Sequence, residues 1–197
     1  MKNKKENFII VFWNFLKKDS WSSWIVSIIL MIILIKFVLF PTMAFLTGSK
    51  LPVVIVESCS MYHDESFDEW WDKNGMWYEQ KNISKKEFSG YPLKNGLNKG
   101  DIVVVIGKKE YKKGDIIIFE ASSKYPIIHR IVSKEPIGTK GDNNQNQIVP
   151  NGLTRIDETN ISKEKIIGKA VFRIPYLGWI KLIFFDLFGN PTKRGFC

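Results

Sequence analysis

The sequence predicts a mainly β protein, with an antiparallel, barrel-like domain anchored by an N-terminal transmembrane helix. Two observations predict this fold class. One apolar run near the N-terminus is long enough to cross a bilayer, and short β-branched stretches with turns between them dominate the rest of the chain. The chain has 197 residues, of which 45% are hydrophobic, so it can bury a core, and wholesale disorder is excluded.

The apolar run covers residues 21–40, about the 20 residues that a helix needs to cross a bilayer. Trp21 and Trp24 are typical of a membrane interface, and a lysine such as Lys36 can extend to the head groups from near a helix end. A buried helix of a soluble protein is the alternative. A cleaved signal peptide fits less well, because the run starts late, is long and has no small-residue cleavage site directly after it.

Lysines flank the apolar run unequally. One, Lys50, follows it closely, whereas five precede it: Lys2, Lys4, Lys5, Lys17 and Lys18. The positive-inside rule then places residues 1–20 in the cytoplasm as a tail and residues 41–173 on the outer side of the membrane. We expect the protein in the cell membrane or the endoplasmic-reticulum membrane.

The formal net charge of +9 comes from scattered lysines rather than from an arginine-rich stripe. This pattern indicates attraction to anionic membrane lipid and not a nucleic-acid partner. Cys59 and Cys197 form no disulfide framework or zinc spacing, so we expect two unpaired thiols. The sequence indicates no metal and no cofactor.

Strand signals run through the outer part of the chain. Five apolar, β-branched stretches have the length of strands: 51–56, 101–106, 115–119, 127–132 and 166–174. Repeated Gly-Asp pairs mark turns at 100–101, 114–115 and 141–142. Several short strands joined by turns predict the antiparallel, barrel-like domain.

Two segments depart from this pattern. Residues 63–98 hold many aromatic and charged residues and predict a short helix near 67–71, followed by irregular structure. We interpret them as a surface insertion with a small core of its own; a lid or a loop that dips into the membrane is the alternative. Residues 174–197 begin with an apolar stretch that contains Lys181 and Asp186, which favours an interfacial segment over a second membrane crossing.

The segment Ser58-Cys59-Ser60-Met61 directly follows the first predicted strand. Side chains alternate along an extended chain, so the two serines face one way and the cysteine packs on the other side. A serine hydroxyl is a weak nucleophile until a base takes its proton, and the chain has 2 histidines. His129, in a predicted strand, is a better candidate for the base than His63, which follows the serines in an irregular stretch.

An aspartate completes the order Ser, His, Asp. Asp142, within Gly141-Asp142-Asn143-Asn144, would orient the imidazole of His129 and stabilise its charged form. An ordinary turn is the alternative reading of this segment, and Asp157 is a more distant reserve for the acid. The combination predicts a membrane-bound serine peptidase with Ser60 as nucleophile and His129 as general base.

Four segments, in this order, resemble sequence boxes of type I signal peptidases, and in particular of their archaeal and endoplasmic-reticulum branch. The likeness covers residues 20–62 and 99–182, and its boxes are Ser58-Cys59-Ser60-Met61, His129-Arg130, Gly141-Asp142-Asn143-Asn144 and Ile174-Pro175-Tyr176-Leu177-Gly178-Trp179. In the bacterial branch a lysine stands where this chain has His129. The chain departs from the family in two places. Residues 62–99 form a long spacer between the serine box and the next Gly-Asp pair, and Gln145-Asn146-Gln147-Ile148 stands where the histidine branch often has a second acid.

The resemblance implies a serine endopeptidase that removes signal peptides from exported preproteins. It also implies an oxyanion site made by the backbone N–H of Ser60 and the hydroxyl of Ser58. The partners that it implies are signal peptides, membrane lipid and the protein-export translocon. Two alternative functions remain, which are a different membrane-anchored serine processing peptidase and a non-catalytic anchored β domain that binds partners.

Overall fold

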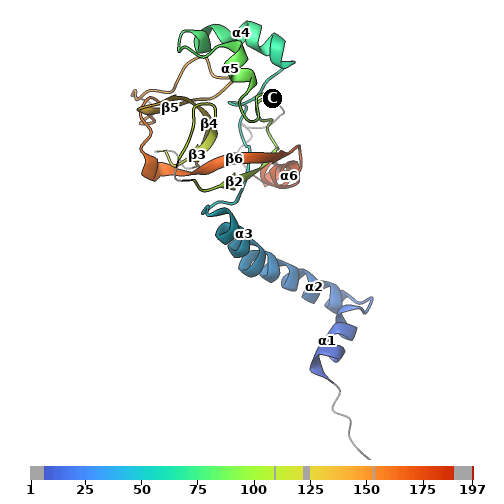
Figure 1. The fold of residues 1–197 in the computed structure, drawn as a ribbon. Helices are drawn as coiled ribbons and strands as arrows, with labels where there is room; N and C mark the ends of the chain where they lie inside the picture. Colours follow the sequence, from blue (N-terminus) through green and yellow to red (C-terminus); the bar gives the residue numbers. More distant parts are fainter. Residues whose placement is uncertain (1–6, 109, 122–124, 153, 189–196) are drawn as a thin grey trace, which may run out of the picture. The chain divides into compact units, whose positions relative to one another are not determined.

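The computed structural model describes residues 7–197, except 109, 122–124, 153 and 189–196 (Figure 1). The chain divides into two compact units, residues 1–46 and residues 47–197. The first unit is helical. Its elements are α1 (Phe8–Leu16), α2 (Trp21–Leu34), the π-helical turn η1 (Ile35–Leu39) and most of α3 (Phe40–Thr47).

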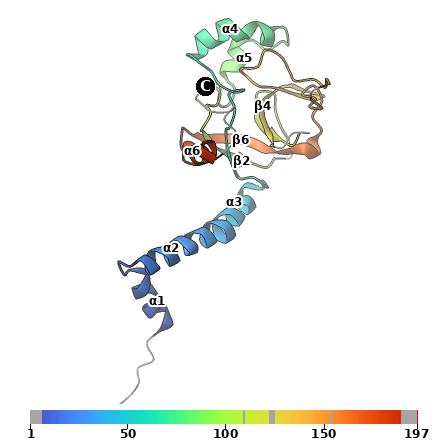
Figure 2. The same ribbon diagram turned by 180° about the vertical axis from the view of Figure 1, so that it is seen from behind.

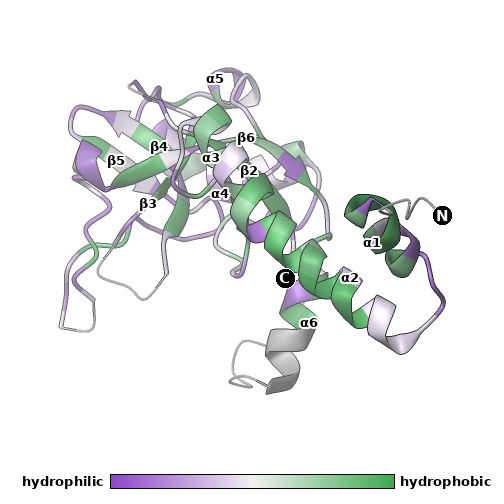
Figure 3. Cartoon of the chain, turned by 90° about the horizontal axis from the view of Figure 1, so that it is seen from below, coloured by the Kyte–Doolittle hydropathy of each residue, from purple (hydrophilic) through white to green (hydrophobic). Residues whose placement is uncertain are grey.

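The elements α2, η1 and α3 form one continuous helix, Trp21–Thr47, of 27 residues. Among the described residues it is the one helix that is long and apolar enough to cross a membrane. Its apolar side chains are exposed, and Figure 3 shows α2 as mostly hydrophobic. The helix continues past the predicted end at residue 40, and α1 is a helix within the segment that the sequence analysis treats as a tail.

The second unit is built on one antiparallel sheet. Among the described residues the sheet has six strands in the order β1-β2-β6-β3-β4-β5. The strands are β1 (Val53–Ile55), β2 (Ile102–Ile106), β3 (Ile116–Phe119), β4 (Ile127–Lys134), β5 (Ile137–Lys140) and β6 (Ile166–Ile174). Strands β1 and β5 are its two edges, so the sheet is open and not a closed barrel. All five predicted strands are present, and β5 is an additional one.

The core of the second unit lies against the central strands. Alternate residues of β2 are buried, with Val103 and Val105 both 0% exposed, as expected for a strand with one face toward a core. Strand β3 is buried at each of its four positions, because it lies between two neighbours and is covered on both faces. Met61, which directly follows the candidate nucleophile, packs into this core.

Residues 63–98 form two helices, α4 (Phe67–Glu79) and α5 (Lys85–Ser89), which lie together in both views of the ribbon (Figures 1 and 2). Ser66 and Glu69 form a capping box that starts α4. The helices enclose a cluster of buried residues that also includes a residue of β4: Trp70, Trp71, Tyr78, Ile83, Phe88 and Val132. The insertion therefore has a core of its own. Trp70 and Trp71 are 0% and 4% exposed, which excludes them as residues that dip into a membrane.

The C-terminal part of the chain begins with α6 (Trp179–Phe188), a helix of 10 residues. This described length is below the about 20 apolar residues that a helix needs to cross a bilayer. Cys59 and Cys197 form a disulfide, with their Cα atoms 5.5 Å apart. The expectation of two unpaired thiols is therefore wrong, because the fold brings the last residue back to the turn that follows β1.

Candidate functional site

Ser60 lies in a turn that is fixed on both sides. Its neighbour Met61 is buried in the core, and the Met61 carbonyl accepts a hydrogen bond from Leu97 N–H at 2.8 Å. The Ser60 carbonyl accepts a hydrogen bond from Asn143 N–H, also at 2.8 Å. The Ser60 side chain is half-buried, and its Oγ lies 3.2 Å from Oγ of Ser58. The turn thus presents two adjacent hydroxyls on a rigid support.

The imidazole of His129, on β4, faces this turn and is 3% exposed. Gly141 makes the approach possible. A Cβ at that position would lie 2.7 Å from Nε2 of His129 and 2.7 Å from the Ser60 carbonyl, so a side chain there would collide with both. The structure therefore brings together Ser58, Ser60 and His129. No hydrogen bond joins the Ser60 hydroxyl to His129 in the described part of the chain, and such bonds are often long without substrate.

Asp142 binds a different set of side chains. Its Oδ2 lies 2.7 Å from Nη2 of Arg130 and 3.1 Å from Nε2 of His63. Its Oδ1 accepts a hydrogen bond from the Tyr78 hydroxyl at 3.1 Å. Burial raises the pKa of the Asp142 carboxyl, but the charge and hydrogen bonds of Arg130 and His63 outweigh burial and hold this pKa well below its usual range.

The structure does not bring Asp142 to His129, although the sequence analysis expects that contact. The reason is the alternation of side chains along β4. His129 and Arg130 are consecutive residues of that strand, so they point to opposite faces of the sheet, and Asp142 binds on the Arg130 face. His63, the weaker candidate for the base, belongs to the same group, where it stacks on Trp70 with ring centroids 3.8 Å apart.

On the face of β4 that carries His129, a glutamate forms the contact that was expected from Asp142. Glu158 Oε1 forms a hydrogen bond with Nδ1 of His129, and the side chain of Glu158 is fully buried. The reserve candidate Asp157, one residue earlier, instead bonds the hydroxyl and backbone N–H of Thr159. No sequence motif marks Glu158, which lies 29 residues after His129. Sequence reasoning therefore had no signal with which to choose it over Asp157.

Lys140, the last residue of β5, is also buried, directly before Gly141. Its Nζ donates a hydrogen bond to the Gly141 carbonyl at 3.1 Å and lies 4.8 Å from the ring centroid of Tyr78. Burial lowers the pKa of Lys140 to about 8, while nearby carboxylates act in the opposite direction. The Gly141 carbonyl, between the His63–Asp142 pair and the His129–Glu158 pair, therefore accepts a hydrogen bond from a lysine whose pKa is lowered.

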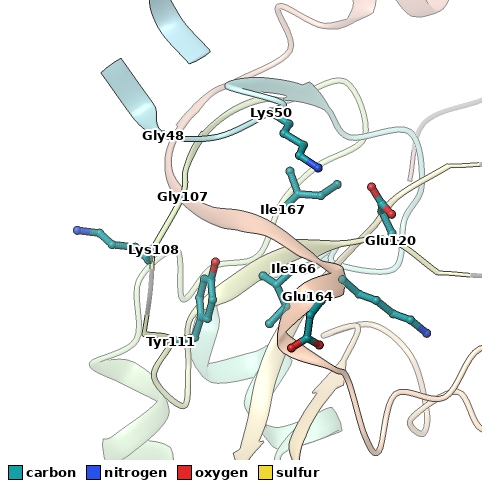
Figure 4. Close-up of a pocket in the computed structure, with 10 residues that line it drawn as sticks. Gly48, Lys50, Gly107, Lys108, Tyr111, Glu120, Glu164, Ile166 and Ile167 are labelled. Carbon is teal, nitrogen blue, oxygen red and sulfur yellow. The ribbon is translucent and has the colours of Figure 1, made fainter. Parts of the chain in front are cut away.

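A cavity of about 410 Å³ lies elsewhere on the second unit (Figure 4). Its lining contains lysines and glutamates together with Tyr111, and it includes neither Ser60 nor His129. Among the described residues, no group of three His, Cys, Asp or Glu side chains is placed to hold a metal ion. Around the Ser60 turn the described residues bring together two hydroxyls, the imidazole of His129 and, bonded to that imidazole, the carboxylate of Glu158.

Comparisons with known proteins point the same way. The chain is 30% identical over 101 residues to the signal peptidase complex catalytic subunit SEC11 of Colletotrichum graminicola, which covers 46% of this chain and 58% of that protein. It is 24% identical over 151 residues to human signal peptidase complex catalytic subunit SEC11C, which covers 72% of this chain and 61% of that protein. No family model matches the chain.

The SEC11 protein of Zygosaccharomyces rouxii is 29% identical over 100 residues, which are 46% of this chain and 59% of that protein. The chain thus spans about three fifths of the length of the curated relatives that it matches. The resemblance to the endoplasmic-reticulum branch of type I signal peptidases is confirmed at this modest identity. Over these lengths, this chain is similar in sequence to catalytic subunits of signal peptidase complexes.

Proposed function

We propose that the protein is a membrane-anchored serine endopeptidase that removes signal peptides from exported preproteins. One observation carries the proposal. The Ser60 turn and the His129 imidazole meet at Gly141, in a chain whose relatives are named catalytic subunits of signal peptidase complexes. The placement of Gly141 supports it further, because this position tolerates no side chain between the two groups.

The proposed mechanism forms and then hydrolyses an acyl-enzyme. Nε2 of His129 takes the proton of the Ser60 hydroxyl as Oγ attacks the scissile carbonyl, and the protonated imidazole then gives that proton to the leaving amine. The backbone N–H of Ser60 and the hydroxyl of Ser58 donate hydrogen bonds to the oxyanion of the tetrahedral intermediate. Water, deprotonated by His129, releases the cleaved signal peptide and restores Ser60.

The edge of the sheet supports an extended substrate. Among the described residues β1 pairs only with β2, so its other edge is open to a peptide strand that would run toward the Ser60 turn. Backbone hydrogen bonds would supply affinity, and two shallow pockets would select the small residues that the family's substrates carry. The barrel-like curvature expected from the sequence belongs to this proposal, since it would shape the groove beside β1.

Membrane anchoring completes the proposal. The helix Trp21–Thr47 would span the membrane, with the N-terminus in the cytoplasm and the β unit on the outer side, in the cell membrane or the endoplasmic-reticulum membrane. Enzyme and preprotein held in one bilayer meet at a high effective concentration, so modest affinity suffices. Membrane lipid and the export translocon are proposed partners, and the relatives' names suggest assembly with further subunits.

The test is cleavage of a preprotein by the purified full-length protein, with sequencing of the new N-terminus. We expect one cut at the signal-peptide boundary, and no cut from Ser60→Ala or His129→Ala. Cuts only at other sites would indicate a different processing peptidase. Failure of a serine-directed reagent to label Ser60 in a folded protein, together with no cleavage, would indicate a non-catalytic binding domain.

A further inference from the structure

We propose that Glu158 is the positioning residue for His129, in the place that the sequence assigns to Asp142. The proposal rests on the proposed peptidase function, in which His129 is the general base. It concerns the residue that fixes the orientation and tautomer of the imidazole. Neither the family boxes nor the spacing along the chain points to Glu158.

The contacts of Glu158 fix the imidazole in the orientation that catalysis needs. Its Oε1 bonds Nδ1 of His129. A carboxylate can only accept, so in the neutral imidazole this contact selects the tautomer with the proton on Nδ1 and the lone pair on Nε2. Nε2 is the atom that lies at Gly141 beside the Ser60 turn. The pair thus turns the basic nitrogen toward the candidate nucleophile.

The carboxylate of Glu158 is itself held from two sides. The Thr139 hydroxyl, on β5, donates a hydrogen bond to Oε1 at 2.9 Å, and the Ile148 N–H donates one to Oε2 at 2.7 Å. The backbone around Glu158 runs along the β5 edge, where the Glu158 carbonyl accepts from Thr139 N–H at 2.8 Å. The carboxylate therefore has a fixed position, as a positioning residue requires.

Glu158 is buried, and among the described residues its one ion-pair partner is His129. No lysine or arginine lies within ion-pair distance of it, and the charge of Lys140 acts on it only from farther away. A buried carboxylate of this kind is stabilised when the neighbouring imidazole becomes positively charged. His129 acquires that charge when it takes the Ser60 proton. The pair is therefore arranged to favour the charged state that forms during the reaction.

Asp142 is unavailable for this role. Both of its oxygens are engaged by Arg130, His63 and Tyr78, and it lies on the opposite face of β4 from His129. The chain also lacks an acid in Gln145-Asn146-Gln147-Ile148. Glu158 reaches His129 from beyond that segment, and the segment's own Ile148 N–H helps to hold the carboxylate.

The kinetic test compares four variants of the full-length protein on a preprotein substrate. Glu158→Gln removes the charge, and we expect kcat to fall about 10²- to 10⁴-fold with KM nearly unchanged. Glu158→Asp keeps the charge and should recover part of that loss. Asp157→Asn removes the neighbouring carboxylate and should leave kcat unchanged.

Gln147→Ala separates positioning from support of the loop. The Gln147 amide donates to the backbone carbonyls of Thr139 and Glu158, at 2.9 and 3.0 Å, and does not touch the Glu158 carboxylate. It should lower the melting temperature with little change in kcat. If Glu158→Gln and Gln147→Ala lose kcat only in proportion to their loss of stability, Glu158 is structural and the proposal is overturned.

A second readout does not depend on turnover. The chain has 2 histidines, so the Nδ1 proton resonance of His129 can be assigned by its loss in His129→Ala. In a Ser60→Ala background this resonance should move in Glu158→Gln and stay in Asp157→Asn. If Glu158→Gln fails to fold, Glu158→Asp decides: wild-type kcat with the resonance displaced would overturn the proposal.

The outcomes keep the two proposals apart. Loss of cleavage in Ser60→Ala and His129→Ala, with wild-type kcat in folded Glu158→Gln, would overturn the role of Glu158 and leave the peptidase function intact. Cleavage by Ser60→Ala would overturn the peptidase mechanism, and the Nδ1 resonance would still report whether Glu158 holds His129.

Discussion

The structure contains two histidine–carboxylate pairs, His63–Asp142 and His129–Glu158, and both are almost completely buried. They differ in their surroundings. Asp142 also binds the guanidinium of Arg130, and His63 lies flat against Trp70. In the second pair, His129 faces the Ser60 turn, and among the described residues no arginine or lysine forms an ion pair with Glu158, which Lys140 reaches only at longer range.

This difference indicates what each pair can do. A carboxylate already neutralised by an arginine gains little when its histidine takes a proton, so the first pair is suited to holding the fold together. It joins β4 to the insertion, because Arg130 also donates to the carbonyls of Pro92 and Leu93, both at 2.9 Å. The second pair responds to a proton on the imidazole, so it is suited to acid–base chemistry.

The largest expected effect comes from removing the charge of Asp142. Asp142→Asn leaves the buried Arg130 without its counter-charge, which should lower the free energy of unfolding by about 3–5 kcal/mol. Denaturant unfolding measures this loss. The control is Glu65→Gln, which breaks the exposed pair with Lys73 and should change the free energy of unfolding little, because solvent screens that pair. A stable Asp142→Asn variant without activity would instead place Asp142 in the catalytic machinery.

A smaller effect, on activity, is expected at the point where His129 meets the serine turn. Gly141→Ala introduces a methyl group 2.7 Å from Nε2 of His129, so the imidazole and the turn must separate. A misplacement of about 1 Å can cost on the order of 100-fold in rate, and we expect kcat to fall by about that factor.

The matched control for this substitution is Gly152→Ala, because a Cβ at Gly152 meets no atom within 4 Å. It should leave both kcat and the melting temperature near their wild-type values. Steady-state kinetics on the preprotein substrate measures the comparison. Wild-type kcat in Gly141→Ala would show that the close approach of Ser60 and His129 is not needed for cleavage.

Several features of the fold could be predicted from local sequence. The β-branched runs that became β2, β3 and β6 carry their strand preference in each residue, and their burial follows the alternation. Strand β5 is only four residues, Ile137–Lys140, and contains a glycine, so its strand character comes from pairing with β4. The disulfide joins residues 138 positions apart, a distance at which local pattern carries no information.

The site was predictable to the same extent. Ser60 and His129 could be chosen because Ser60 follows a predicted strand, His129 lies within another, and the chain has 2 histidines. The partner of His129 could not be chosen, because it depends on which face of β4 each side chain takes and on how the chain returns to the β5 edge. Asp142 carries the expected motif and lies on the other face, whereas Glu158 carries no motif and lies on the correct one.

The smallest expected effect concerns Lys140, which lies at the turn between the two pairs. In the folded protein Lys140 loses its proton near pH 8, against 10.5 in an unfolded chain. Between these values the unfolded state binds more protons, so the Lys140 contribution makes the free energy of unfolding rise with pH. Lys140→Met removes this contribution, and its stability relative to the wild type should decline by about 1–3 kcal/mol from pH 7.5 to 10.

Chemical denaturation at a series of pH values measures this difference. The control is Lys94→Met, which removes an exposed lysine that lies over the ring of Phe67 and should change stability equally at each pH. Lys140 donates to the Gly141 carbonyl, so its proton also supports the turn that separates Asp142 from His129. Parallel pH curves for Lys140→Met and the wild type would show that this turn keeps its stability without a titrating cation.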